Sequence, residues 1–210
     1  MKPVAADHPI ADEDMMRAQF YALLSRLLVS PPEEDVLADL AGLTGDDTDI
    51  GQALAALGEA ARGTDADAVE TEFNALFIGL TRGEIVPYAS YYLTGFLHEK
   101  PLAELRDDLA ALGIERAPGH CQPEDHFGFL CEVQCGLILG TYGPPDLAVQ
   151  KTFFDKHISP WADALFADIE AAPSAVLYRP IATIGRLFTA VERDAFAMAG
   201  DLSKHDLSKP

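Results

Sequence analysis

Apolar residues recur at every third or fourth position through most of this 210-residue chain. The segment from Met15 to Val29 shows the pattern most clearly, with apolar side chains at Met16, Phe20, Leu23, Leu24, Leu27 and Leu28. This spacing places side chains along one face of an α-helix. No stretch shows the apolar–polar alternation or the turn dipeptides that indicate a strand or hairpin. The sequence therefore predicts an all-α fold, a single globular helical domain of about nine or ten helices.

Glycine and proline divide the chain into predicted helices. These cover residues 15–29, 33–42, 50–61, 66–78, 101–112, 123–142, 146–171 and 174–198, with a short ordered segment at 88–98. Pro160 and Pro180 are expected to bend or interrupt the last two helices, because a proline inside a helix removes one backbone hydrogen bond. Between Gly79 and Pro87 the periodicity lapses, and we expect an irregular loop. We assign residues 1–200 to the helical domain and the polar residues 201–210 to a frayed tail.

Charge and cysteine content restrict the partners and the compartment. The formal net charge is −19, so we expect neither nucleic acid nor an anionic membrane as a partner, whereas a basic peptide would be attracted. Three cysteines cannot all pair within one chain, and the first residues contain no apolar run typical of a secretory signal. No apolar stretch approaches the roughly 20 residues of a membrane span. We therefore expect a cytoplasmic protein with reduced thiols and no stable membrane insertion.

Residues 122–130 open a long predicted helix with a proline, two acids and a histidine. Pro123 suits a first helical turn, and Glu124 and Asp125 lie where negative charge offsets the helix dipole. On this interpretation His126 shares a helical face with the apolar residues that follow, and it is a core residue. The other interpretation is that Asp125 and His126 face a groove and exchange hydrogen bonds with a bound peptide.

A second cluster of large apolar residues flanks the expected loop. Leu76 and Phe77 precede the loop, and Pro87 and Tyr88 follow it. Aromatic side chains beside an irregular loop often line a recognition groove, because they give a large contact area at low entropic cost. They can equally be core residues beneath a long loop. A third cluster, residues 153–161 with the only tryptophan, is interpreted mainly as packing.

A metal site is the alternative interpretation of the histidines and cysteines near the first cluster. A small helical metal-binding protein or enzyme could use His120, Cys121, His126 and Cys131, which lie close in sequence. The paired, short-spaced ligands of a structural zinc site are missing, however. The chain also lacks the phosphate-loop, dinucleotide-binding and hydrolase motifs. We therefore expect no enzyme activity, no catalytic residue, no metal and no cofactor.

Three motifs in a fixed order resemble those of the TorD/DmsD family of molybdoenzyme maturation chaperones, which is related to NarJ. They are Phe73-x-x-Leu76-Phe77-x-Gly79 followed by Pro87-Tyr88-x-Ser90, then residues 123–128, and then residues 153–161 with Tyr178-Arg179 beyond. Together these motifs span roughly residues 70 to 190. The helices that precede them agree with the family in length and pattern only.

This resemblance implies a non-enzymatic, all-helical cytoplasmic protein. Such chaperones bind the N-terminal twin-arginine signal peptide, or an equivalent segment, of the apo form of a molybdopterin-dependent oxidoreductase catalytic subunit. They hold the subunit until its cofactor is inserted, and they delay export until folding is complete. In this family the Asp-His pair and the aromatic-rich loop contribute to signal binding. The matching positions, implied as peptide-binding residues, are Pro123, Asp125, His126, Leu76, Phe77, Pro87 and Tyr88.

The chain departs from the family pattern at two places. Leu80-Thr81 stands where DmsD-like members carry Pro-Trp, and Tyr88 stands where tryptophan is common. These differences leave the client open among trimethylamine-oxide, dimethyl-sulfoxide, nitrate, formate and related oxidoreductases. Family members also bind guanine nucleotides and form domain-swapped dimers. No motif here predicts either property, so a monomer and a domain-swapped dimer both remain as alternatives.

Overall fold

The structure is a computed structural model that describes residues 10–79, 82–115 and 122–206. Within these residues it contains ten α-helices, two π-helical segments and no strand, which confirms the predicted all-α class. The helices are α1 (Asp12–Val29), α2 (Glu34–Ala41), α3 (Asp49–Arg62), α4 (Ala66–Phe73), α5 (Ala89–Thr94), α6 (Lys100–Ala111), α7 (Phe127–Leu139), α8 (Leu147–Phe153), α9 (Ser159–Ala171) and α10 (Tyr178–Asp206). The π-helical segment η1 (Asn74–Ile78) continues α4, and η2 (Phe154–Ile158) joins α8 to α9.

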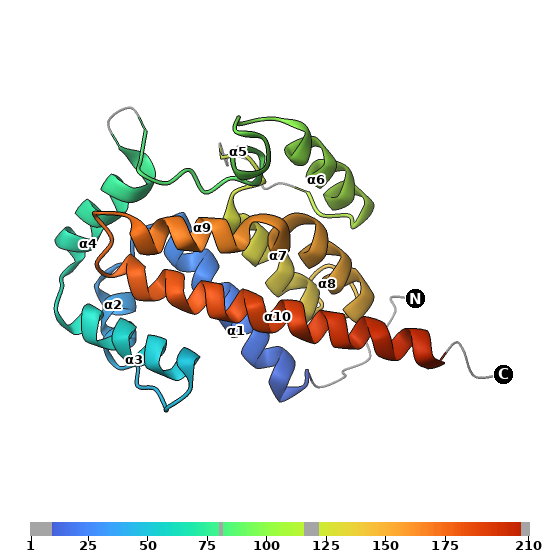
Figure 1. Cartoon of the computed structure of the whole chain (residues 1–210), viewed down its shortest axis with the longest axis horizontal. Helices are drawn as coiled ribbons and strands as arrows, with labels where there is room; N and C mark the ends of the chain where they lie inside the picture. Colours follow the sequence, from blue (N-terminus) through green and yellow to red (C-terminus); the bar gives the residue numbers. More distant parts are fainter. Residues whose placement is uncertain (1–9, 80–81, 116–121, 207–210) are drawn as a thin grey trace, which may run out of the picture.

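Four helices form the centre of the molecule. Helix α1 packs along α7, and α10 packs along α9 and against α3. Figure 1 shows α9 and α10 crossing the middle of the molecule, with α2, α3 and α4 at one end and α5, α6 and α8 at the other. Helix α10 reaches Asp206 and so continues into the segment that composition predicts as a tail.

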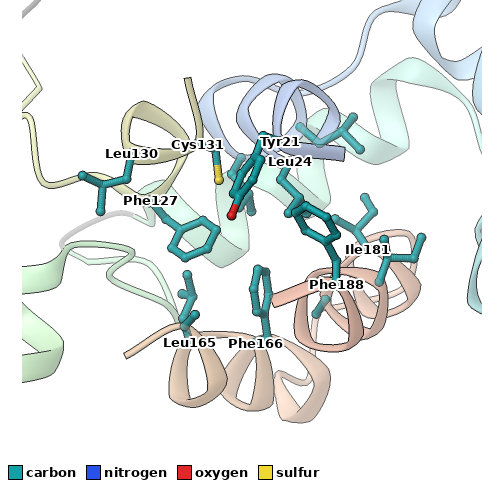
Figure 2. Packing of buried hydrophobic residues seen from close by; sticks show 14 of the residues in the cluster. Tyr21, Leu24, Phe127, Leu130, Cys131, Leu165, Phe166, Ile181 and Phe188 are labelled. Carbon is teal, nitrogen blue, oxygen red and sulfur yellow. The ribbon is translucent and has the colours of Figure 1, made fainter. Parts of the chain in front are cut away.

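Large side chains from all four central helices meet in the core. Figure 2 shows Tyr21 of α1, Phe127 of α7, Phe166 of α9 and Phe188 of α10 pointing toward one another. The rings of Phe127 and Phe166 lie edge to face with their centroids 5.0 Å apart. A Cβ atom at Gly185 would lie 2.2 Å from the Phe166 ring, so the glycine allows α10 to approach α9.

Three predicted helix boundaries need correction. Helix α7 begins at Phe127 and not at Pro123, because His126 is its N-cap residue. Helix α10 begins at Tyr178, so Pro180 lies in its first turn and interrupts nothing, since backbone N–H groups there have no intrahelical acceptor. The predicted helix 146–171 is continuous from Leu147, and the π-helical η2 ends immediately before Ser159-Pro160. The prolines therefore lie where their missing N–H groups cost little.

A buried carboxylate holds the start of α10 against the end of α4. Glu72 is 9% exposed and accepts hydrogen bonds from the backbone N–H groups of Val176, Leu177 and Tyr178 at 2.7, 3.1 and 2.8 Å. The first N–H groups of a helix have no acceptor within the helix, and a carboxylate satisfies them while it also complements the helix dipole. Glu72 thus attaches the start of α10 to the end of α4, where the Phe77 ring also meets the Tyr178 ring.

Candidate functional site

Two segments that are far apart in the sequence pair immediately before α5 and α7. Tyr88 and His126 form an isolated antiparallel bridge. The N–H of Ala89 donates to the Asp125 carbonyl, and the N–H of Phe127 donates to the Pro87 carbonyl, both at 2.9 Å. The backbone thus brings together Pro87, Tyr88, Asp125 and His126, four of the seven residues that the resemblance implies.

The Asp125 carboxylate lies beneath this bridge. Its side chain is fully buried, and its Oδ2 accepts hydrogen bonds from the N–H and the hydroxyl of Ser90 at 2.8 and 2.5 Å. Its other oxygen, Oδ1, has no hydrogen-bond partner among the residues that the structure describes. A buried carboxylate oxygen without a donor is costly, and a donor that reaches it gains a strong, charge-assisted bond. Asp125 therefore orders the start of α5 and keeps one acceptor vacant.

His126 is a neutral imidazole at the N-terminus of α7. Its Nδ1 accepts a hydrogen bond from the Gly128 N–H at 3.1 Å, which places the ring proton on Nε2. Burial lowers the pKa of His126 to about 4. Its ring meets the Tyr88 ring edge to face, with centroids 5.1 Å apart. Tyr88 is half-buried, and burial, followed by the nearby Asp125 carboxylate, raises the pKa of its phenol.

Pro123 and Glu124 precede the helix and do not begin it, contrary to the helix-start interpretation. Pro123 is half-buried, and Glu124 is 9% exposed. The Glu124 carboxylate accepts two hydrogen bonds from the Arg106 guanidinium of α6, at 3.0 and 2.8 Å. The acid therefore attaches α6 to the segment that precedes α7.

Leu76 and Phe77 lie before the irregular segment that leads to Tyr88. Leu76 is fully buried in the core, and its carbonyl accepts a hydrogen bond from the Ile85 N–H at 2.8 Å. Phe77 is half-buried, and its ring lies 5.2 Å from that of Tyr178. Residues 86 and 87 then lead from Ile85 to Tyr88, and the Tyr88 N–H closes a tight turn there by donating to the Val86 carbonyl at 2.8 Å. This segment joins the aromatic end of η1 to the Asp-His pair, and among the described residues no ring contact links Phe77 to Tyr88 or His126.

Ser90 and Glu72 have roles that the sequence analysis did not assign. Ser90 is part of the quoted motif, but only the folded chain shows that its hydroxyl meets Asp125. Glu72 lies three residues after Val69 and four before Leu76, on the buried face of α4 and η1. In the sequence, a charged residue on an otherwise apolar helical face is the sign of such a role, because a charged group that is buried needs a hydrogen-bond or ion-pair partner.

The third cluster packs as predicted. Trp161 is 2% exposed, and its indole N–H donates to the His157 carbonyl at 2.7 Å. The Trp161 ring also contacts the Tyr92 and Phe127 rings, with centroids 5.3 and 5.2 Å apart. His157 Nε2 lies 2.7 Å from an Asp108 carboxylate oxygen, which joins η2 to α6.

The residues named for a metal site are not assembled in the described part of the chain. His120 and Cys121 lie outside the described residues, as does the Leu80-Thr81 departure. Cys131 is fully buried, and burial raises the pKa of its thiol well above the ordinary value. Among the described residues no group of three or more potential metal ligands is found. The same residues include no helix long and apolar enough to cross a membrane.

Comparison with known proteins places this architecture in a family. The model of the nitrate reductase delta subunit family matches residues 43–167, more than half of the chain, and the chain belongs to this family. The matched segment contains η1, the Tyr88–His126 bridge and α7. Membership confirms the NarJ-related resemblance that the motifs indicate.

A solved structure has the same fold. It is that of a protein from Archaeoglobus fulgidus described as a redox enzyme maturation protein, with 19% sequence identity and a TM-score of 0.53. The similarity covers 89% of this chain and 97% of the other. No curated protein sequence matches the chain.

Proposed function

We propose that this protein is a cytoplasmic maturation chaperone for a redox enzyme. Its client is the apo form of a molybdopterin-dependent oxidoreductase catalytic subunit, whose N-terminal twin-arginine segment it binds. Binding assists cofactor insertion and delays export until the subunit has folded. Family membership and the fold shared with the Archaeoglobus protein support the chaperone class. The observation that carries the peptide-binding part is the buried Asp125 carboxylate with its vacant Oδ1.

A guanidinium group suits this acceptor. Arginine presents N–H donors in a planar fork that matches carboxylate geometry, and the bond strengthens where water is excluded. His126 adds a neutral Nε2–H donor on the same bridge, suited to a peptide carbonyl. Because Asp125 is fully buried, an arginine reaches Oδ1 only when the side chains that cover Asp125 move aside. We expect only a ligand that forms the strong arginine–carboxylate contact to compensate for this movement.

Of the other implied residues, some are exposed enough to contact the peptide and others are buried and position the contacting residues. Tyr88 and Phe77 are half-buried and offer ring surface to the apolar part of the peptide. Pro87 and Leu76 are buried, so we assign them to positioning the segment that connects Phe77 to Tyr88. The net charge of −19 attracts a cationic segment from a distance. We expect the association rate to fall with added salt, since salt screens exposed charges.

Two experiments test the proposal. The tagged protein, purified from native cytosol, should retain a molybdopterin oxidoreductase subunit identified by mass spectrometry. A synthetic peptide of that subunit's N-terminal segment should then bind in a calorimeter, and Asp125→Ala and Phe77→Ala should weaken binding while helicity is unchanged. Wild-type affinity in both variants would remove these residues from the site. Absence of any peptide binding by the wild-type protein would overturn the proposed function.

A further inference from the structure

The last turn of α1, residues 26–29, lies between the two parts of the candidate site. On one side it meets the aromatic end of η1 through Tyr178. The Tyr178 hydroxyl donates to the Leu27 carbonyl at 2.8 Å, and the Tyr178 ring lies 5.2 Å from that of Phe77. Because Tyr178 is fully buried, this contact fixes the end of α1 beside η1.

On the other side the same turn meets the start of α7. A Cβ atom at Gly128 would lie 2.6 Å from Val29 Cγ2 and 3.3 Å from His126 Nδ1, so the glycine allows α1 to approach the His126 ring. Val29 is 44% exposed, and its side chain therefore borders His126 and also faces solvent. The end of α1 thus connects the two parts of the site, although no motif of the sequence contains it.

α1 ends with a backbone carbonyl that the following residues do not satisfy. The last four carbonyls of a helix have no donor within the helix. Ser30 has extended backbone angles, and Pro31-Pro32 after it have no N–H to return to the helix end. Among the described residues no hydrogen bond reaches the Val29 carbonyl. Arg26, the basic residue of this turn, donates to the Ser30 hydroxyl at 3.1 Å.

This end of α1 suits the backbone of an extended peptide. Such a peptide presents N–H and C=O groups that both need partners where water is excluded. The Val29 carbonyl is an acceptor at the negative end of the helix dipole, which favours an N–H donor. The neighbouring His126 supplies the opposite kind of group, a donor at Nε2. The exposed Val29 side chain adds an apolar contact between them.

We propose that the last turn of α1 is a third wall of the peptide site. The Val29 carbonyl accepts a hydrogen bond from the backbone of the client's N-terminal segment, and the Val29 side chain contacts an apolar residue of that segment. The segment thus runs from His126 across Val29 toward Phe77. This inference rests on the proposed function and adds a contact to the backbone, whereas Asp125 receives an arginine side chain.

A substitution of Val29 tests the side-chain contact. Val29→Ala removes two methyl groups from an exposed position and leaves the carbonyl in place. Val191→Ala is the matched control, because Val191 is 59% exposed on α10 and lies outside the site. The probe is a fluorescein-labelled synthetic peptide of the N-terminal segment of the captured subunit, and fluorescence anisotropy gives its affinity. We expect Val29→Ala to weaken binding roughly threefold to tenfold and the control to bind as the wild type does.

The hydrogen bond is measured in the wild-type protein, so this test does not depend on how a variant folds. Ser30 has an N–H, and in an HNCO spectrum of isotope-labelled protein this N–H reports the Val29 carbonyl carbon. Peptide binding should move that carbon downfield. In a series of peptides that each replace one backbone N–H by an ester oxygen, one peptide should bind roughly threefold to tenfold more weakly and cause no such movement.

Two results would overturn the inference and leave the proposed function intact. The first is wild-type affinity in Val29→Ala together with lost affinity in Asp125→Asn, which would remove the Val29 side chain from the site. The second is an unchanged Val29 carbonyl carbon in the saturated complex, which would exclude the hydrogen bond. Absence of peptide binding by the wild type would instead reject the proposed function itself.

Discussion

Replacement of Glu72 by alanine should cost a large part of the stability of this fold. The carboxylate accepts three backbone N–H bonds of 2.7 to 3.1 Å at the start of α10, and two of the donors, on Leu177 and Tyr178, are buried. Leaving a buried donor unsatisfied costs about 1–3 kcal/mol. The N–H of Val176 belongs to an exposed residue and can bond to water instead. We therefore expect a loss of about 4 kcal/mol, out of the roughly 5–15 kcal/mol typical of a domain.

Urea unfolding followed by circular dichroism measures this loss. With an m value of about 3 kcal/mol/M, the midpoint of Glu72→Ala should fall by more than about 1 M while m stays constant. Glu72→Gln keeps one acceptor oxygen and should lose about half as much. Glu70→Ala, an exposed acid on the same helix, is the control and should stay within about 0.5 kcal/mol of the wild type. If Glu72→Ala and Glu70→Ala gave the same midpoint, the capping argument would be wrong.

Two further predictions concern stability. The pKa of His126 is about 4 in the folded protein and 6.5 in the unfolded chain, so the unfolded chain takes up the proton first as pH falls. Stability should therefore fall between pH 6.5 and 4, by about 2 kcal/mol at pH 5, and urea unfolding of His126→Asn, which keeps an N-cap acceptor, should lack this component. Gly185→Ala should lower stability by about 1–3 kcal/mol, because its Cβ would lie 2.2 Å from the Phe166 ring. Phe166→Leu in the same chain should recover part of this loss in thermal melts, and full additivity of the two losses would contradict the contact.

Periodicity predicted the helices well because burial of one helical face governs them. The predicted segments 15–29, 50–61 and 66–78 correspond to α1, to α3, and to α4 with η1. The apolar spacing that forms each helix and the glycines and prolines that end it lie within or next to the segment itself. The π-helical character of η1 and η2 was not predicted, because an extra residue in a turn leaves little trace in an apolar spacing.

The start of α7 was predicted wrongly for a non-local reason. Proline followed by two acids is typical of a first helical turn, yet the Asp125 side chain bonds to Ser90 and Glu124 bonds to Arg106. Both partners belong to other helices, and the antiparallel bridge at Tyr88 brings Ser90 to Asp125. The preference of a short sequence for a helix start does not reveal contacts with distant residues. The helix therefore begins after Glu124 and Asp125, whose side chains make these contacts.

The candidate site was predicted in part. The motifs named Pro87, Tyr88, Asp125 and His126, and the bridge brings these four together. The roles of Ser90 and Glu72 depend on how separate helices pack. Those features follow from tertiary contacts and have no signature in the spacing of any one segment.

Titration of the client's N-terminal peptide into Asp125→Asn tests the central claim most directly. The asparagine carbonyl can still accept from Ser90, so the start of α5 keeps its hydrogen bonds while the charge beside the vacant oxygen is removed. We predict an unchanged fold by circular dichroism and an affinity at least roughly tenfold weaker, as expected when an arginine–carboxylate contact is lost. Replacing the twin arginines by lysines should weaken binding to the wild type by a similar factor and have little effect on the variant. Equal affinity of Asp125→Asn and the wild type for the arginine peptide would contradict the claim that this buried carboxylate receives the signal segment.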